Sequence, residues 1–495
     1  MTPRCAVYVS LTGLLLAGVL SAQQIETLLL PSDLPLVTFR ILFRTGAASD
    51  PAGKEGAGAL TAAMLARGGS LAMSYDQIVQ AMFPLATTVR AQVDKEMTVI
   101  YGTTHVENLD RFYGLLRSMV LEPGWRDEDF RRLKSDAMNF LRVELRGNND
   151  EELGKEALYL RIYDGHPYGH DNTGTIAALE KMTLDDLKNF YRLNYTQANL
   201  VIGLAGGYPR GFEDKVKADF ARLPAGARRT LDLPPPKPTR KLRVEILEKK
   251  TRAVAISLGF PLAINRSASD WPALLVAQSY LGQHRSSKSH LYDRLREARG
   301  LNYGDYAYLE YFPRGMFLME PEPNLGRQQQ IFQIWIRPVE PPNAMFALRA
   351  GLYELDKLVT QGLSKEDFET TRTFLSKFVN LLIQTPSAQL GYALDSKYYG
   401  IPEFNGYLKS ALARLTLEDV NRAIKKYLRT TDLDIVIVAQ DAAGLRKAIL
   451  SGAPSTVTYV SPKPKEILEE DKVIGRYRLD VSGVEIVPVE KIFEQ

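Results

Sequence analysis

The chain contains TLDDL at residues 183–187 and a near copy, TLEDV, at residues 416–420, 233 positions later. Each stretch opens a helical pattern, with a threonine suited to cap the helix and acidic residues in the first turn. Each pattern ends at a strand-like apolar run, residues 200–205 in one copy and 433–439 in the other, at the same offset. The sequence therefore predicts two homologous halves that arose by duplication.

A second repeated stretch supports the same interpretation. The tripeptide Glu-Asp-Phe occupies residues 128–130 and 366–368, at an offset of 238 that requires only a small insertion. Each half begins with an alternating or β-branched run, Val37 to Phe43 and Val254 to Phe260, and then passes to a long helix. Each half later closes with a helix and a final strand, so the pattern predicts an α+β unit that is used twice.

The boundary between the halves is marked by proline. Residues 233–238 read Leu-Pro-Pro-Pro-Lys-Pro, which favours a semi-rigid extended spacer because proline disrupts helices and central strands. We therefore expect an N-terminal half at 23–232, a linker at 233–241 and a C-terminal half at 242–460. Residues 461–495 show no helical period and are expected to lie extended on one of the halves.

The N-terminus has the features of a secretory signal peptide over residues 1–22. Arg4 supplies a positive end, residues 11–20 an apolar run, and Ser21-Ala22 a small-residue cleavage site. We expect the mature chain to begin near Gln23, to be periplasmic and to carry no membrane anchor, because the apolar run is too short to span a bilayer.

Composition narrows the class of protein further. The 495 residues are 45% hydrophobic and 24% charged, which is typical of a globular protein with sizeable cores. Sixty-two Lys and Arg against 58 Asp and Glu give a net charge of +4, so nothing indicates a nucleic-acid partner. The only cysteine, Cys5, lies in the signal peptide, and we expect neither disulfides nor cysteine-bound metals.

Several motifs together resemble one known family. DPAGKEG at residues 50–56, a helix through residues 64–65, HPYG at 166–169 and Gly174-Thr175 resemble the N-terminal half of the pitrilysin (insulinase) family of zinc metallopeptidases. The resemblance spans nearly the whole mature chain. It implies two α/β-sandwich halves of the pitrilysin/LuxS-like metallohydrolase fold, each with a mostly antiparallel sheet covered by helices.

The zinc motif of that family is lost here. In the family, H-x-x-E-H on a helix supplies two zinc ligands and a general base. The matching positions are Ala59, Ala62 and Ala63, which have no lone pair to offer. The family's third ligand, a glutamate, is also missing from the window around residues 138–141. The resemblance thus implies no zinc in this chain. Three nearby glutamates are interpreted as a solvated helix end: Glu144, Glu151 and Glu152.

The histidines offer little alternative metal chemistry. Only His166 and His170 have a ligand-like spacing, and Pro167 and Gly169 argue against a helix between them. A zinc site needs three or four converging ligands, and only Asp171 lies nearby. We therefore expect residues 166–169 to form a loop packed against the first half.

A second family motif lies in the C-terminal half. Residues 289–300 predict a helix closed by a glycine, with the next strand starting at residues 301–303. Arg296 and Tyr303 are seven residues apart. The family's substrate-binding arginine and tyrosine have the same spacing; they lie in the second homologous half and face the zinc carried by the first. Such a pair supplies two preorganised donors where negative charge develops on a peptide carbonyl oxygen. Two neighbouring arginines are interpreted as surface charges: Arg294 and Arg299.

The resemblance implies a zinc-free subunit of a heterodimeric zinc metallopeptidase. A homologous partner would carry the zinc, and the two would close around an unfolded peptide held extended against a sheet edge. The alternative is a scaffold or peptide-binding subunit without catalytic contribution, which would be expected to lack the arginine and tyrosine as well. A lone peptidase would need a nucleophile or metal cluster that the sequence does not offer.

Overall fold

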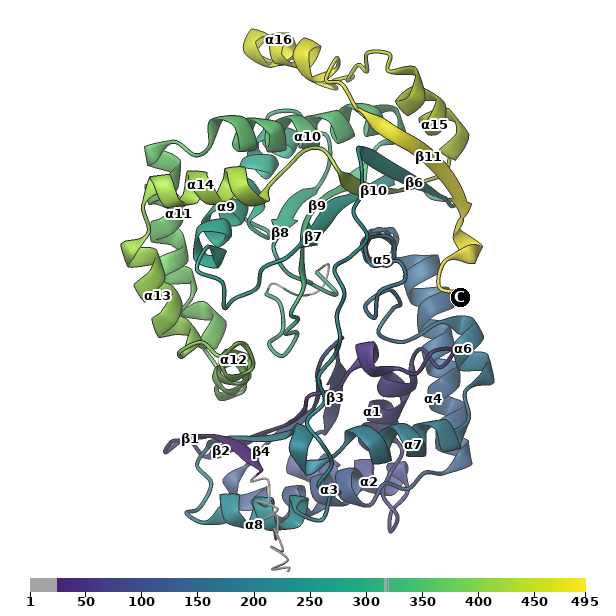
Figure 1. Cartoon of the computed structure of the whole chain (residues 1–495), viewed down its shortest axis with the longest axis vertical. Coiled ribbons are helices and arrows are strands. Elements are labelled where there is room, and N and C mark those ends of the chain that lie inside the picture. Colours follow the sequence, from purple (N-terminus) through teal and green to yellow (C-terminus); the bar gives the residue numbers. More distant parts are fainter. Residues whose placement is uncertain (1–24, 316–317, 319) are drawn as a thin grey trace, which may run out of the picture.

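The computed structural model describes residues 25–315, 318 and 320–495. The predicted signal peptide and Cys5 lie outside these residues. The fold contains two sheets, each covered by helices, in separate parts of the molecule (Figure 1). The first sheet is built from residues before the proline-rich stretch and the second from residues after it, so the predicted α+β organisation is confirmed.

The two sheets share one strand order, which confirms the predicted duplication. The first runs β1-β5-β2-β4-β3 and the second β6-β10-β7-β9-β8, with β11 added beside β6. The first-sheet strands are β1 (Glu26–Pro31), β2 (Leu36–Phe43), β3 (Arg90–Val93), β4 (Thr98–His105) and β5 (Leu200–Gly206). The second-sheet strands are β6 (Leu242–Glu248), β7 (Val254–Leu262), β8 (Gly304–Tyr308), β9 (Gln330–Val339), β10 (Leu433–Ala439) and β11 (Val481–Pro488).

Both sheets are mixed but mostly antiparallel. The predicted strand runs form β2 and β7, each of which pairs antiparallel with both neighbours. Each is preceded in the chain by a strand that the sequence pattern did not reveal. These strands, β1 and β6, pair in parallel with β5 and β10, the last strands of the two repeats. The end of each repeat is thereby joined to its beginning.

The helices cover the sheets and connect the strands. Those of the first half are α1 (Ala57–Arg67), α2 (Tyr75–Met82), α3 (Leu109–Leu121), α4 (Asp127–Asn139), α5 (Asp150–Ile162), α6 (Ile176–Lys181), α7 (Leu184–Asn194) and α8 (Phe212–Phe220). Those of the second half are α9 (Trp271–Gly282), α10 (Ala344–Gln361), α11 (Lys365–Phe378), α12 (Pro386–Tyr399), α13 (Phe404–Arg414), α14 (Leu417–Tyr427), α15 (Ala442–Ser451) and α16 (Lys465–Ile474). Two π-helical segments are η4 (Phe140–Asn148) and η6 (Tyr292–Glu297).

The repeated threonines start equivalent helices. The Thr183 hydroxyl accepts a hydrogen bond from the backbone N–H of Asp186 at 3.2 Å, and Thr416 accepts one from Asp419 at 3.1 Å. In both cases the aspartate side chain accepts a hydrogen bond from the threonine N–H in return, which completes a capping box. The predicted helix starts are confirmed.

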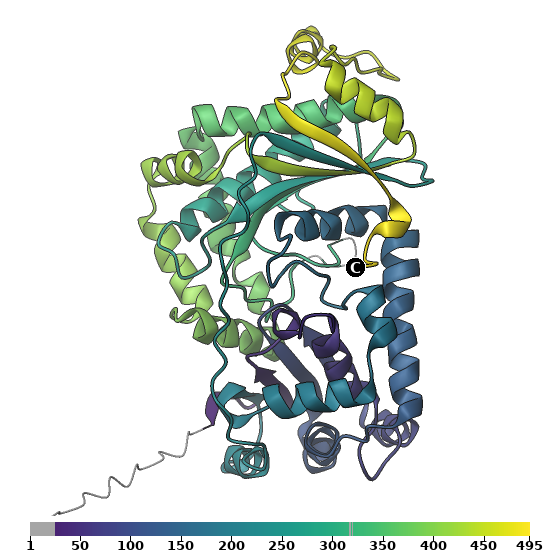
Figure 2. The same ribbon diagram turned by 45° about the vertical axis from the view of Figure 1, so that its right-hand side comes forward.

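The two halves exchange one helix each. Helix α5 belongs to the first half in sequence but packs on β7 and β10 of the second sheet, whereas α12 packs on β2 and β5 of the first sheet. Leu153 and Leu390, 237 residues apart, occupy equivalent places in the two contacts. Because each sheet is covered partly by the other half, the halves form one body (Figures 1 and 2).

A buried ion pair also joins the halves. The turn between β3 and β4 carries Asp94, whose carboxylate receives two hydrogen bonds from the Arg327 guanidinium at 2.7 and 2.5 Å. Both residues are almost fully buried. Burial alone would raise the pKa of Asp94, but the charge and hydrogen bonds of Arg327 outweigh it and hold the pKa below its ordinary value. The pair therefore stays charged near neutral pH.

The C-terminal tail is only partly extended. Its strand β11 adds to the second sheet as expected, but residues 465–474 form α16, so the expectation of a tail without helix was wrong. Beyond β11, the carbonyl oxygen of Phe493 accepts a hydrogen bond from Ile176 N–H at 2.8 Å, and the Phe493 side chain enters the first-half core. The tail thus lies on both halves (Figure 2).

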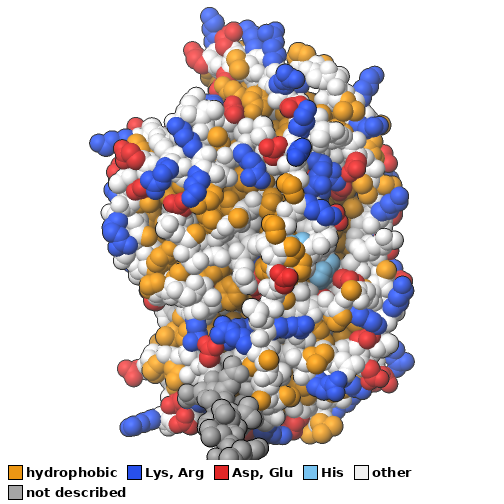
Figure 3. Space-filling model, viewed as in Figure 1, with side chains coloured by type: hydrophobic (Ala, Val, Ile, Leu, Met, Phe, Trp, Pro, Cys, Tyr) orange, Lys and Arg blue, Asp and Glu red, His pale blue; other side chains and the backbone are white. Residues whose placement is uncertain are grey.

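On the face seen in Figure 3, basic and acidic side chains are interspersed. Within the described residues, no helix is long and apolar enough to cross a membrane.

Candidate functional site

Helix α1 carries the positions at which the resembled family has its zinc motif. Both carboxylate oxygens of Asp50 cap the start of α1, accepting hydrogen bonds from the N–H groups of Gly56 and Gly58 at 2.6 and 2.7 Å. Gly56 has a φ of +103°, and a Cβ there would lie 2.4 Å from the Thr173 carbonyl oxygen. The DPAGKEG stretch therefore fixes the entry to α1 through a glycine that no other residue can replace without strain.

The alanines of α1 open onto a large cavity. Ala59, Ala62 and Ala63 line it together with Glu144, and its volume is about 900 Å³. The whole of β3 lines the same cavity, and β3 is the edge strand of the first sheet. The backbone groups on the free side of an edge strand are available to pair with an added strand. The cavity therefore combines space with a sheet edge.

Two of the glutamates interpreted as a solvated helix end lie elsewhere, and one of them, Glu152, lines the cavity. Glu152 is buried and accepts a hydrogen bond from Lys155 at 2.8 Å, while Glu151 pairs with Arg337, so neither belongs to a solvated helix end. Their helix, α5, is covered by the second half. Only Glu144 is exposed as expected.

Glu156 is a further carboxyl group that the sequence did not single out. It is buried at the cavity wall and accepts a hydrogen bond from the Tyr311 hydroxyl at 3.0 Å. Burial, reinforced by the neighbouring charge of Asp171, raises the pKa of Glu156 to about 8. The cavity thus contains an acid that keeps its proton near neutral pH.

His166 and His170, the two histidines with ligand-like spacing, have structural roles. His166 Nδ1 accepts a hydrogen bond from Tyr168 N–H at 3.0 Å, and His170 Nε2 lies 3.3 Å from Asp50 Oδ2, beside the cap of α1. Tyr168 donates its hydroxyl to Glu96 of the β3–β4 turn. The expected loop packed on the first half is confirmed. In the described part of the chain, no group of three or more His, Cys, Asp or Glu residues could hold a metal ion.

Arg296 and Tyr303 come together at the surface of the second half. Arg296 lies in η6 and Tyr303 directly before β8, one residue ahead of the strand rather than in it. The Arg296 guanidinium donates to the Tyr303 carbonyl oxygen at 2.9 Å and lies 4.5 Å from the centre of the Tyr303 ring. The ring of Tyr292, which sequence reasoning missed, has its centre 4.7 Å from the same guanidinium. Its spacing of four residues from Arg296 on a helix is the signal that could have revealed it.

The pair is accessible. Tyr303 is 68% exposed, and across the described residues its hydroxyl has no hydrogen-bond partner. The Arg296 side chain is 31% exposed. The turn after η6 closes at Gly300 with a φ of +67°, as expected. Neither Arg296 nor Tyr303 lines the alanine-lined cavity, so the two predicted groups of site residues form separate sites within this chain.

The interpretation of Arg294 and Arg299 as surface charges was wrong. Arg299 is 3% exposed and pairs with Asp471 at 2.8 Å and Glu470 at 2.7 Å, both on α16. Arg294 is half-buried and pairs with Glu354 at 3.0 Å. These contacts fix η6, which carries Arg296, to the tail helix.

Sequence comparison places the chain among known proteins. Residues 181–375 match the family model described as "Peptidase M16 inactive domain". By that description, this part of the chain is similar to an M16 peptidase domain. It is 25% identical to an uncharacterised zinc protease of Mycobacterium tuberculosis over 241 residues, 48% of this chain and 53% of that protein. The chain thus spans about half the length of this curated relative.

A second curated relative is a non-peptidase homolog, YmxG, of Helicobacter pylori. It is 21% identical over 338 residues, 66% of this chain and 71% of that protein. Among solved structures, a peptidase M16 inactive domain from Pseudomonas fluorescens matches with a TM-score of 0.73 and 21% identity, covering 84% of this chain and 95% of that one. The periplasmic protease PqqL from Escherichia coli matches with a TM-score of 0.66 and 14% identity, covering 92% of this chain and 50% of that one. These structures establish the fold.

Proposed function

We propose that this chain is the zinc-free subunit of a heterodimeric zinc metallopeptidase in the periplasm. In this proposal a homologous partner carries the zinc motif, and Arg296 and Tyr303 of this chain act on the peptide bound there. The observation that carries the proposal is the contrast between Ala59, Ala62 and Ala63, which cannot bind zinc, and an intact, accessible Arg296–Tyr303 pair.

The geometry of the pair suits an oxyanion. Attack on a peptide carbonyl places negative charge on its oxygen, and preorganised donors aimed at that position lower the barrier. The Arg296 guanidinium lies near two tyrosine rings and is hydrogen-bonded to the Tyr303 carbonyl oxygen, which limits its movement, and the Tyr303 hydroxyl is free to donate. An exposed pair contributes little to the stability of its own chain, and exposure is what a site shared between two subunits requires.

The edge strand supports a role in holding peptide. An extended peptide added to β3 would receive main-chain hydrogen bonds and extend into the alanine-lined cavity. The alanines and the polar lining leave room for side chains of varied size. This feature supports peptide binding by this subunit whether or not it contributes to catalysis.

The test is reconstitution with a zinc-bearing partner, such as the product of a neighbouring reading frame with H-x-x-E-H. Arg296→Ala should lower kcat/KM on a quenched fluorescent peptide about a hundredfold. Arg296→Lys should be nearly as poor, because a flexible ammonium does not reproduce the planar fork. Arg252→Ala, which removes an exposed arginine from the turn before β7, is the matched control and should keep the wild-type rate.

Assays of the isolated chain complete the test. It should contain no stoichiometric zinc after dialysis and should not cleave unfolded peptides alone. If Arg296→Ala and Arg296→Lys complexes keep wild-type rates, the catalytic role is rejected and the chain is a scaffold or peptide-binding subunit. Chelator-sensitive cleavage by the chain without a partner would reject both the catalytic-partner role and the scaffold role.

A further inference from the structure

A second, smaller pocket lies in the second half, at the place that corresponds to the alanine-lined cavity of the first. Its walls come from α9 and from residues that follow β8, just as α1 and β3 line the first cavity. Phe140 of the first cavity and Phe378 of this pocket are 238 residues apart, the offset of the Glu-Asp-Phe repeat. The duplication therefore left two equivalent spaces with different linings.

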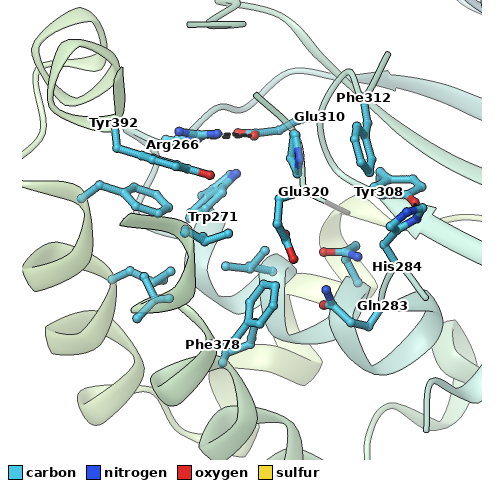
Figure 4. A pocket seen from close by; sticks show the side chains of 18 residues that line it. Arg266, Trp271, Gln283, His284, Tyr308, Glu310, Phe312, Glu320, Phe378 and Tyr392 are labelled. Carbon is cyan, nitrogen blue, oxygen red and sulfur yellow. Dashed lines mark hydrogen bonds and ion pairs between the residues drawn. The ribbon is translucent and has the colours of Figure 1, made fainter. Parts of the chain in front are cut away.

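The pocket is small and mostly apolar. Its volume is about 110 Å³, and aromatic side chains form much of its wall, among them Trp271, Phe378 and Tyr392 (Figure 4). An apolar cavity of about 150 Å³ accepts benzene. This pocket therefore has room for an alkyl chain of a few carbon atoms, the apolar stem of a small ligand.

One carboxyl group in this pocket has no partner. Figure 4 shows the Glu320 side chain pointing into the pocket, toward Gln283 and Phe378. Of the described residues, none donates a hydrogen bond to Glu320 or forms an ion pair with it. An unpaired carboxylate in apolar surroundings is costly, and a bound cation would remove that cost.

The other charged groups of the pocket are already satisfied. Arg266 forms three hydrogen bonds with Glu310, at 2.9, 3.3 and 2.8 Å, and lies 3.5 Å from Asp395. His284 is hydrogen-bonded to Tyr308, and burial lowers its pKa to about 4, so it is neutral near pH 7. Among the described residues that line the pocket, no positive charge is therefore left unpaired to oppose a cation.

We propose that this pocket binds a primary ammonium group carried on a short apolar stem, with Glu320 as its counter-ion. The three N–H donors of an ammonium match the Glu320 carboxylate and the side-chain oxygens of Gln278 and Gln283. The Gln278 amide nitrogen already donates to the Ala307 carbonyl oxygen at 2.6 Å, which leaves its oxygen as an acceptor. Aromatic side chains around the stem provide apolar contacts for it. A lysine side chain and a free alkylamine share this chemistry, and the site does not depend on the proposed peptidase role.

Calorimetry on the full chain tests the site with matched probes. At pH 7.5, n-butylamine should bind at least about tenfold more tightly than n-butanol, because a charged hydrogen bond distinguishes them. Glu320→Gln should abolish this preference. Glu322→Gln is the matched control, since Glu322 lies two residues away, pairs with Arg314 at 2.5 Å and lines the other cavity. Equal binding of amine and alcohol to the wild type would overturn the proposal.

A pH series on the wild-type chain provides an independent readout if Glu320→Gln does not fold. Burial raises the pKa of Glu320 to about 7, so amine binding should release a proton at pH 6 and tighten as the pH rises to about 7.5. Affinity that does not change over this range would contradict the proposal. N-acetyl-lysine amide identifies the source of the ligand: binding equal to that of n-butylamine indicates a lysyl side chain, and binding of the amine alone indicates a free alkylamine.

Discussion

The two halves of this molecule have the same strand order and different chemistry beside their edge strands. Next to β3, the first half has a cavity of about 900 Å³ with alanines and carboxyl groups. Next to β8, the second half has an aromatic pocket of about 110 Å³ and, at the surface, the Arg296–Tyr303 pair. Duplication preserved the fold because core packing demands it, while a few side chains on equivalent helices were free to change function.

The exchanged helices show a similar asymmetry. Helices α5 and α12 cross to the opposite sheet at equivalent points, marked by Gly154 and Gly391, 237 residues apart. A Cβ on Gly154 would lie 3.2 Å from Ser257 Oγ, whereas one on Gly391 would lie 2.3 Å from Pro323 Cγ. Pro323 belongs to the second half itself, so α12 is held closely between its own half and the first sheet, where Arg40 Cζ would lie 3.2 Å from the same Cβ. The two positions should therefore respond differently to substitution.

The largest effect on stability is expected from the ion pair between the halves. Arg327→Ala should lower the free energy of unfolding by about 3–5 kcal/mol, because it leaves Asp94 charged and buried without its partner. Urea denaturation measures the change. The exposed pair of Lys188 and Asp185 provides the control, and Lys188→Ala should change stability by less than about 1 kcal/mol. A loss from Arg327→Ala no larger than the control would show that this pair does not hold the halves together.

A smaller effect should separate the two exchanged helices. Gly391→Ala should cost about 1–3 kcal/mol, because the added methyl group overlaps Pro323. Gly154→Ala should be close to neutral, since a helix-propensity gain of about 1 kcal/mol offsets a mild contact with Ser257. Thermal unfolding of both variants measures the difference. Equal effects at the two positions would contradict the close approach of Pro323 to Gly391.

A third effect concerns pH and the cavity of the first half. The pKa of Glu156 rises on folding to about 8, so its contribution to stability is complete below about pH 4.5 and is lost as the pH rises toward 8. Glu156→Gln removes this proton linkage, and the variant should gain stability relative to the wild type between pH 5 and pH 8. The midpoints of urea denaturation of both proteins at pH 5 and at pH 8 measure this gain in stability. A constant difference between the two proteins would contradict a raised pKa.

Local sequence patterns were sufficient to predict the repeat and its helix starts. TLDDL and TLEDV each contain the complete capping signal, so α7 and α14 depend on no distant residue. The same holds for Gly300, whose positive φ ends the turn after η6.

Burial of charged residues depended on distant contacts that no local pattern contains. Arg299 follows a helix and resembles a surface charge, but its partner Asp471 is 172 residues away on a helix in a segment expected to be extended. Likewise Glu152 and Glu156 lie on α5, whose acidic sequence is typical of a solvated helix. In the structure the second sheet covers this helix, and both side chains are buried. The relation between the alanine-lined cavity and Arg296 also required the three-dimensional structure.

The most direct measurement of the central claim is kcat/KM of the reconstituted complex with Tyr303→Phe. This substitution removes one exposed hydroxyl and little packing, so folding and subunit association should remain near wild type. If the hydroxyl donates to the oxyanion, kcat/KM should fall about a hundredfold or more, mainly through kcat. A Tyr303→Phe complex that assembles normally and cleaves peptide at the wild-type rate would contradict the claim that this chain completes a partner's active site.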